Sequence, residues 1–302
     1  MRTAVSGSHG FIGSALVPAL QAAGHDVVRL VRSAGAGPGE ISWDPESGHL
    51  DRAALAGVDA AVHLAGAGIG DRRWTAAYQR RIMDSRVKGT DLLARTLAEV
   101  EPRPAVLVSG SAIGYYGERG DEELTEESGP GQGFLAEVVR AWEAAAAPAA
   151  DAGIRVVHLR SGIVLAADGG VLAKQLPLFK RGLGGRLGSG RQWTSWIARH
   201  DEVAAIRHAL THDELAGPVN ATAPHPVTNA EFTGALARVV GKAARLPVPK
   251  LALAAALGPE MARETALVSQ RVLPAKLQAS GFAFAHPLIE EALAAALGKE
   301  CC

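Results

Sequence analysis

The stretch that decides the fold is Val5-Ser-Gly7-Ser-His-Gly10-Phe-Ile-Gly13, near the start of the chain. It follows a short strand pattern at Thr3–Ser6 and opens an apolar helical pattern at Ile12–Ala23. Glycines between a strand and a helix allow a tight turn and a close backbone approach to a pyrophosphate, which the free N–H groups of the helix start can bind. Surface turns also use glycine, but the strand before and the helix after predict a dinucleotide-binding site.

Outward from this motif, the first half of the chain alternates strand and helix patterns. The predicted strands are Thr3–Ser6, Val27–Val31, Ala60–Leu64, Ala105–Ser109 and Val156–Leu159, and the predicted helices are Ile12–Ala23, Thr75–Ala98 and Phe134–Ala150. This alternation predicts an α/β fold, a Rossmann-type doubly wound parallel sheet with helices on both faces.

The pattern changes after Leu165. A glycine-rich stretch at 182–190 is followed by helical patterns at Asn229–Val240, Lys250–Leu257, Ala262–Val268 and Ile289–Leu297. We therefore predict that residues 1–165 form the nucleotide-binding domain, with 196–223 returning to it. Residues 166–195 and 224–302 would form a smaller, mainly helical substrate domain.

Composition limits the function classes. The 302 residues are 48% hydrophobic and 21% charged, which is typical of a soluble globular protein. Because 31 basic residues balance 31 acidic ones, we expect no nucleic-acid partner. No apolar run approaches the roughly 20 residues that span a bilayer, and no signal peptide is recognisable, so we expect no membrane partner and a cytoplasmic location. Cys301 and Cys302 stand alone and make no four-ligand zinc site, so no metal site is expected.

The end of the second predicted strand bears on the choice of cofactor. An acidic residue there would bind the ribose 2′-hydroxyl of NAD, whereas arginine accommodates the 2′-phosphate of NADP. The sequence has Arg32 and Ser33 at this point, and Asp26 lies at the wrong end of the strand. We therefore predict NADP(H) as the cofactor. The alternative is that Arg32 is an ordinary exposed charge.

Two further strand ends carry candidate site residues. The small residues of His63-Leu64-Ala65-Gly66 would let a ribose or nicotinamide approach the backbone, and His63 is predicted to be a core residue rather than a base. The second end, Ser109-Gly-Ser111-Ala-Ile-Gly-Tyr115-Tyr116, places hydroxyls and phenols at the sheet edge where α/β proteins bind ligands. These side chains could hydrogen-bond a substrate, or they could form a polar turn.

Taken together, these motifs resemble the extended short-chain dehydrogenase/reductase superfamily, the NAD-dependent epimerase/dehydratase group. The resemblance covers nearly the whole chain. It rests on Gly7-x-x-Gly10-x-x-Gly13, His63-Leu-Ala, Arg86-Val-Lys-Gly89-Thr90, Ser109-Gly-Ser111 and Trp196-Ile-Ala-Arg-His-Asp201-Glu-Val203, where Ala198 and Arg199 depart from the family pattern.

A narrower resemblance is to an atypical branch usually labelled "epimerase family protein", which ends in a domain of unknown function. It rests on Gly68-Ile-Gly-Asp-Arg-Arg-Trp74, Ser85-Arg86-Val87, the stretch 183–190, Gln192-Trp193, Asn229-Ala-Glu-Phe232 and the tail from Leu246 to Pro287.

The resemblance implies a set of site residues and one conspicuous loss. Active members carry a Tyr-x-x-x-Lys pair on the helix after the serine strand, where the tyrosine acts as general acid/base. Here Ser111 stands at the serine position and Arg86 at that of an asparagine, but the helix offers only Phe134 with Val138 or Leu135 with Val139. Neither pair contains an ionisable group.

The resulting predictions are these. The candidate catalytic residues are Ser111, Tyr115 and Tyr116, and the candidate cofactor contacts are Gly7, Gly10, Phe11, Ile12, Gly13, Arg32, Ser33, Leu64, Ala65, Gly66, Arg86, Ser109 and Val164. Trp193, Trp196 and Arg191 are expected to line a cleft for a small or nucleotide-linked substrate. Two functions remain open: an NADP(H)-dependent oxidoreductase or epimerase with a rebuilt acid/base, and a non-catalytic NADP(H)-binding sensor or interaction protein. A homo-oligomer is possible.

Overall fold

The structure, a computed structural model, describes residues 1–32, 37–244 and 246–299. It divides into two compact units. The first comprises Met1–Ser111, Val138–Arg160 and Val203–Val219, and the second Ala112–Glu137, Ser161–Glu202 and Asn220–Cys302. The chain leaves the first unit earlier than we predicted, because 112–137 belongs to the second unit, and of the segment 196–223 only 203–219 returns. The second unit is about as large as the first rather than smaller.

The first unit is built on an eight-stranded sheet in the order β12-β8-β6-β5-β1-β2-β3-β4. The strands are β1 (Arg2–Ser6), β2 (Asp26–Val31), β3 (Glu40–Asp44), β4 (His49–Leu50), β5 (Ala60–His63), β6 (Val106–Ala112), β8 (Arg155–Ser161) and β12 (Gly217–Ala221). β1 pairs in parallel with both β2 and β5, so the strand order reverses there. Ligands of open α/β sheets bind at the carboxyl ends of the strands beside such a reversal, which is where the glycine motif follows β1.

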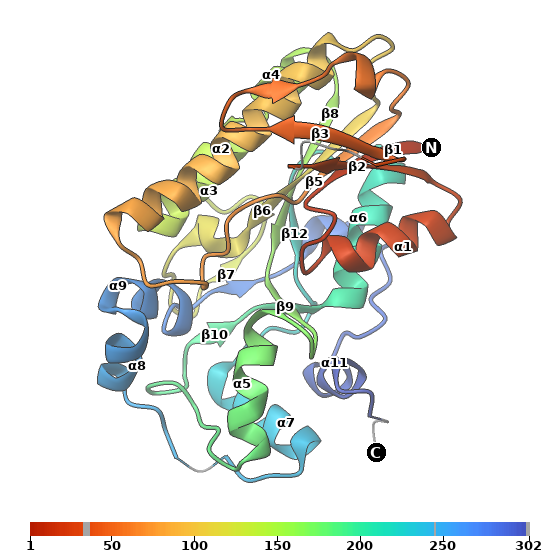
Figure 1. Cartoon of the computed structure of the whole chain (residues 1–302). Coiled ribbons are helices and arrows are strands. Elements are labelled where there is room, and N and C mark those ends of the chain that lie inside the picture. The colour runs from red at the N-terminus through yellow and green to blue at the C-terminus, as the bar shows by residue number, and fades with distance from the viewer. Residues whose placement is uncertain (33–36, 245, 300–302) are drawn as a thin grey trace. The chain divides into compact units, whose positions relative to one another are not determined.

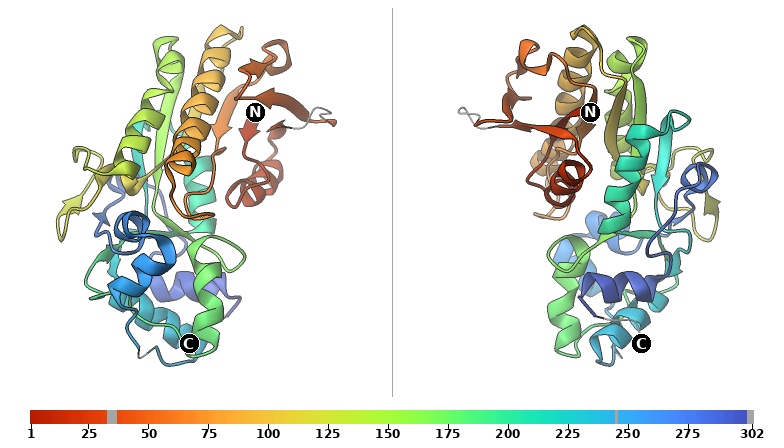
Figure 2. Two further views of the ribbon diagram at one scale, coloured as in Figure 1. Left: turned by 60° about the vertical axis from the view of Figure 1, so that its left-hand side comes forward. Right: turned by 90° about the vertical axis from the view of Figure 1, so that its right-hand side faces the viewer.

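Helices cover both faces of this sheet, as predicted for a doubly wound fold. They are α1 (Gly13–Ala22), α2 (Ala76–Glu99), α3 (Phe134–Ala144), α4 (Ala147–Asp151) and α6 (Arg199–Thr211), with the short turn η1 (Ala53–Leu55). α2, α3 and α4 lie on one side, and α1 and α6 lie on the other (Figures 1 and 2). Buried apolar residues of the sheet and of α2 and α4, among them Leu30, Leu97 and Leu107, form the core between them.

Two differences from the predicted elements have local causes. The helix predicted over Phe134–Ala150 ends at Ala144 and resumes at Ala147. Pro148 explains the break, because it lacks an N–H and its ring would clash with the carbonyl one turn earlier in a continuous helix. β3 was not predicted, since only Ile41 and Trp43 point inward in a strand of five residues.

The second unit is mainly helical, as predicted. Its elements are η2 (Ile113–Tyr116), β7 (Glu123–Leu124), β9 (Ile163–Leu165), α5 (Gly170–Lys180), β10 (Trp193–Thr194), β11 (Trp196–Ala198), β13 (Val227–Thr228), α7 (Asn229–Val240), α8 (Lys250–Leu257), α9 (Pro259–Met261), the π-helical turn η3 (Ala262–Ala266), β14 (Arg271–Val272), α10 (Ala275–Ala279) and α11 (Ile289–Ala296). Its core packs Trp196 against Phe179, Phe232 and Leu293. Among the described residues, the helices are too short or too polar to cross a membrane.

Candidate functional site

The glycine motif forms a tight cradle at the carboxyl end of β1. Gly7 has φ +67°, a conformation that side chains with a Cβ rarely adopt, and a Cβ there would lie 2.7 Å from the carbonyl carbon of Leu64. The Gly10 N–H donates to the Gly7 carbonyl at 2.9 Å, and a Cβ on Gly13 would overlap that same oxygen. α1 then begins at Gly13 with no side chain capping it, and the N–H groups of Ser14 and Ala15 donate to the backbone carbonyls of Gly10 and Ile12. The cradle thus fits a dinucleotide pyrophosphate.

The loop after β5 packs against this cradle. The Leu64 N–H donates to the Ser6 backbone carbonyl at 3.3 Å, and Gly66 lies so close to Arg86 that a Cβ would be 3.4 Å from its guanidinium. Arg86 donates to the Ala67 carbonyl at 2.9 Å. Burial lowers the pKa of Arg86 to about 10, so it remains a cation at neutral pH. The structure therefore places Arg86 beside the predicted cofactor loop.

His63 is a core residue, as predicted. Its Nδ1 lies 2.7 Å from the Ser6 hydroxyl, and its ring packs edge-on against Trp43. Burial, together with the positive charge of Arg86, lowers the pKa of His63 to about 4. The ring is neutral near pH 7, and its Nε2 has no hydrogen-bond partner among the described residues. A buried neutral imidazole in this position favours a structural role for His63.

The other predicted cofactor contacts lie on several different elements. Phe11 and Ile12 belong to the glycine loop, and Arg32 follows β2 with an exposed side chain. Ser109 is fully buried on β6, whereas Val164 lies on β9 in the second unit. Ser33 lies outside the described residues.

Ser111 takes part in a buried ionic network that the sequence did not reveal. Its hydroxyl donates to Glu143 Oε1 at 2.6 Å, and Arg160 binds the same carboxylate with Nε and Nη2, both at 2.8 Å. The side chains of Arg160 and Glu143 are 3% and 13% exposed. A serine has one proton to donate, and here a carboxylate accepts it. This geometry favours a structural role for Ser111.

The amino-acid sequence contains a signal that Glu143 and Arg160 are buried. Glu143 lies four residues after Val139 and next to the buried Trp142, so it follows the apolar stripe of its helix. Arg160 follows the buried Leu159 in β8, a strand that also contains His158. A charge next to buried apolar residues on each of two elements favours a buried pair, because isolated buried charges are strongly unfavourable.

The two tyrosines differ in their surroundings. Tyr116 is fully buried in the second unit, and its hydroxyl donates to Asn220 Oδ1 at 2.7 Å. Asn220 in turn donates to the Leu273 carbonyl at 3.0 Å. Tyr115 is only partly buried, and its ring packs edge-on against Tyr116 with centroids 5.3 Å apart. This arrangement favours a structural role for Tyr116, while Tyr115 is the more exposed of the two residues.

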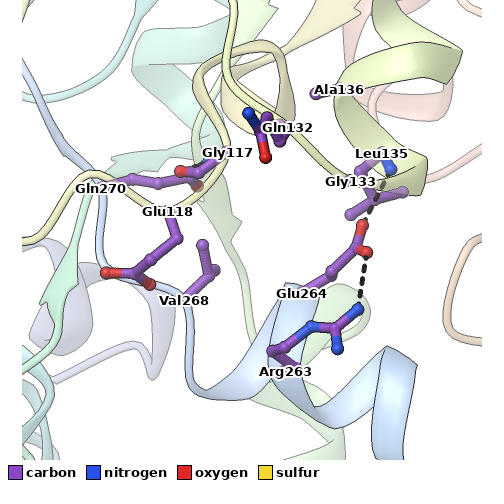
Figure 3. A pocket seen from close by; sticks show the side chains of 11 residues that line it. Gly117, Glu118, Gln132, Gly133, Leu135, Ala136, Arg263, Glu264, Val268 and Gln270 are labelled. Atoms are coloured by element: carbon purple, nitrogen blue, oxygen red, sulfur yellow. Dashed lines mark hydrogen bonds and ion pairs between the residues drawn. The ribbon is translucent and has the colours of Figure 1, made fainter.

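A cavity of about 300 Å³ lies in the second unit around the first turn of α3 (Figure 3). Its lining residues are Gly114, Gly117, Glu118, Gln132, Gly133, Leu135, Ala136, Arg263, Glu264, Val268 and Gln270. Glu264 accepts hydrogen bonds from the N–H groups of Phe134 and Leu135 at 3.2 and 2.9 Å, and so caps the helix that lacks the tyrosine–lysine pair. Figure 3 shows its carboxylate between Arg263 and the backbone of Leu135.

The polar side chains of this cavity are the carboxylates of Glu118 and Glu264, the amides of Gln132 and Gln270 and the guanidinium of Arg263. Glu118 accepts from the Ser269 N–H at 2.6 Å, and each oxygen of Glu118 and Glu264 has further lone pairs. Arg263 is the one cationic side chain of the lining, against two carboxylates, and it is 71% exposed. Sequence reasoning missed this cavity because its walls come from segments that lie more than 120 residues apart in the chain, such as Leu135 and Glu264.

The prediction that Trp196 lines an aromatic cleft is wrong. Trp196 is completely buried in the core of the second unit, on the strand β11, which is buried along its whole length and pairs with β9. Trp193 is more accessible, but its Nε1 donates to Asp121 at 2.9 Å, and the guanidinium of Arg271 stacks over its ring at 4.5 Å. Arg191 has an exposed side chain.

Comparisons with known proteins show the family. Residues 3–221 match the model of the NAD dependent epimerase/dehydratase family, and residues 248–296 match a domain of unknown function, DUF1731. An epimerase family protein of Mycobacterium bovis is 48% identical over 290 residues, which cover 96% of this chain and 95% of that one.

Solved structures lead to the same family. The crystal structure of human epimerase family protein SDR39U1 (isoform 2) with NADPH is 36% identical, has a TM-score of 0.89, and matches 97% of this chain and 98% of that one. UDP-glucose 4-epimerase of Thermus thermophilus in complex with NAD is 21% identical with a TM-score of 0.74, covers 99% of both chains, and shows the fold alone. The chain therefore belongs to the NAD-dependent epimerase/dehydratase family and has its NAD(P)-binding fold.

Proposed function

We propose that the protein binds NADP(H) in the first unit. The glycine cradle and the uncapped start of α1 would hold the pyrophosphate. Arg32, exposed at the end of β2, would bind the 2′-phosphate. Binding of NADPH by the similar human protein supports this assignment.

We further propose that the protein binds this cofactor as a sensor or interaction protein and does not carry out the proton transfers of the family's active members. The observation that carries this proposal is α3, where Phe134, Leu135, Val138 and Val139 occupy both candidate relay positions. When bound, the nicotinamide ring gives or accepts hydride, but a carbonyl or hydroxyl substrate also exchanges a proton with a protein group. Ser111 and Tyr116 already donate their protons to Glu143 and Asn220.

Tyr115 supports a second candidate, an oxidoreductase or epimerase with a rebuilt acid/base. In that case the cavity of the second unit would hold a small substrate. Its two carboxylates repel a diphosphate, whereas they can accept hydrogen bonds from hydroxyl or ammonium groups. We therefore propose a small polyol or amine as the ligand class, rather than a nucleoside-diphosphate sugar. Turnover that is abolished by Tyr115→Phe would favour this candidate.

Cofactor choice is tested by the affinities of the wild type and of Arg32→Ala for NADPH and NADH, measured by calorimetry. Losing a guanidinium contact to a phosphate should weaken NADPH binding by at least tenfold and leave NADH binding nearly unchanged, since a charge-assisted hydrogen bond contributes about 1.5–3 kcal/mol. Arg52→Ala is the matched control, because Arg52 is an exposed arginine of the same unit. Equal losses for both cofactors would refute the assignment of Arg32.

A further inference from the structure

Three side chains of metal-ligating types lie together in the second unit, away from the cavity lining. His200 and Asp201 belong to the first turn of α6, and His286 precedes α11. One ligand atom of each lies within 4.8 Å of those of the other two. Sequence reasoning missed this cluster, because His286 is 85 residues from Asp201 along the chain.

Asp201 is the fixed member of the cluster. Its side chain is 1% exposed, and its two oxygens accept hydrogen bonds from the backbone N–H groups of Ala285 and His286, at 3.0 and 2.9 Å. These bonds hold the 285–286 turn against the start of α6. An ionised carboxylate offers about four acceptor positions; Oδ1 also lies within hydrogen-bond distance of His200 Nδ1, while Oδ2 keeps a position for a further ligand.

The two imidazoles face this carboxylate at different distances. His200 Nδ1 lies 3.3 Å from Asp201 Oδ1, while His286 Nδ1 lies 3.8 Å from Oδ2, beyond hydrogen-bond distance. The buried Nδ1 of His286 has no hydrogen-bond partner in the described part of the chain. The rings meet edge to face, with centroids 5.6 Å apart. The hydrogen bonds to the 285–286 backbone explain why Asp201 is buried. They do not explain why the buried Nδ1 of His286 faces the Asp201 carboxylate without a hydrogen bond.

We propose that His200, Asp201 and His286 bind one divalent transition-metal ion of the zinc class. Two imidazole nitrogens and one carboxylate form a ligand set that such ions prefer, with water completing the coordination. Ligand bonds of about 2.0–2.2 Å require the three atoms to move closer together. His200 can make this movement because its side chain is 69% exposed, while Asp201 and the backbone of His286 stay in place. The ion would then cross-link the 285–286 turn to α6.

The test is calorimetric titration of the metal-stripped protein with Zn²⁺, with visible absorption of the Co²⁺-loaded protein as a second readout. All measurements use a Cys301→Ser/Cys302→Ser background, since terminal thiols also bind zinc. We expect one ion per chain, affinity at least tenfold lower in both His200→Ala and His286→Ala, and a rise in Tm with Zn²⁺ that both variants lose. His200→Ala is the variant least able to disturb folding, because His200 is exposed.

His212→Ala is the matched control. His212 follows the last residue of α6, and its ring stacks on that of His208, with the ring centroids 3.5 Å apart. This substitution should leave the affinity unchanged. The proposal is overturned if no saturable binding is seen. It is equally overturned if binding survives in both His200→Ala and His286→Ala, or is lost only in His212→Ala.

Discussion

Replacement of Arg160 by methionine should lower the free energy of unfolding by about 3–5 kcal/mol, because it leaves the Glu143 carboxylate charged, buried and without its cation. Arg160 makes two hydrogen bonds of 2.8 Å to that carboxylate, each contributing about 1.5–3 kcal/mol. Glu143 is 13% exposed, so water can replace little of what is lost. The remaining bond from Ser111 cannot neutralise the charge.

Urea unfolding of Arg160→Met, Glu143→Met and the double variant measures this effect. The double variant should be more stable than the sum of the two single losses predicts, because it removes both charges together. Arg95→Met is the matched control, since Arg95 and Asp91 form an exposed ion pair within α2 and such pairs contribute about 0.5 kcal/mol or less. A loss below about 1 kcal/mol in Arg160→Met, or strict additivity in the double variant, would refute the assignment of a buried network around Ser111.

Two further changes test the cradle and a buried acid. Gly13→Ala should abolish measurable NADPH binding, because its Cβ would overlap the carbonyl oxygen of Gly7. Gly129→Ala is the control, since Gly129 has open space around it, and it should bind NADPH as the wild type does. Calorimetry measures both affinities, and equal binding by the two variants would contradict the packing of the cradle. Burial raises the pKa of Glu202 from 4.5 to about 7, although the Ser161 hydroxyl donates to it. The unfolded chain releases this proton near pH 4.5 and the folded chain holds it until about pH 7, so the free energy of unfolding should fall between these values by at most about 1.4 kcal/mol per pH unit. Glu202→Gln should remove that slope in urea unfolding from pH 5 to 8, and an unchanged slope would contradict it.

Local sequence signals predicted the nucleotide-binding half well. The glycine spacing and the alternation of strand and helix depend on residues that are neighbours in the chain, so the order of β1, α1 and β2 could be read directly. The same holds for His63, whose place inside an apolar run predicted its burial.

The residues that the sequence did not reveal depend on contacts between distant segments. Ser111 bonds to Glu143 on α3, which lies 32 residues further along the chain, and Glu143 bonds to Arg160 on β8. The partners of Asp201 in the 285–286 turn lie more than 80 residues away from it. A serine hydroxyl reads alike in the sequence whether it faces a ligand or a buried carboxylate. The prediction that Trp196 lines a cleft was wrong for the same reason. Its aromatic ring suits a cleft or a core equally, and its position in the core depends on the packing of β11, which pairs with β9.

The most direct test of the proposed function is a single-turnover measurement on protein loaded with stoichiometric NADPH or NADP⁺. Oxidation of bound NADPH is followed by absorbance after mixing with a panel of aldehydes and ketones, and reduction of bound NADP⁺ is followed after mixing with polyols and amines. We expect the cofactor to bind and to keep its oxidation state with every compound, because Phe134, Leu135, Val138 and Val139 of α3 occupy both candidate relay positions. Rapid hydride transfer with any of these compounds, lost in Tyr115→Phe and retained in Arg52→Ala, would contradict the non-catalytic account and establish a rebuilt acid/base.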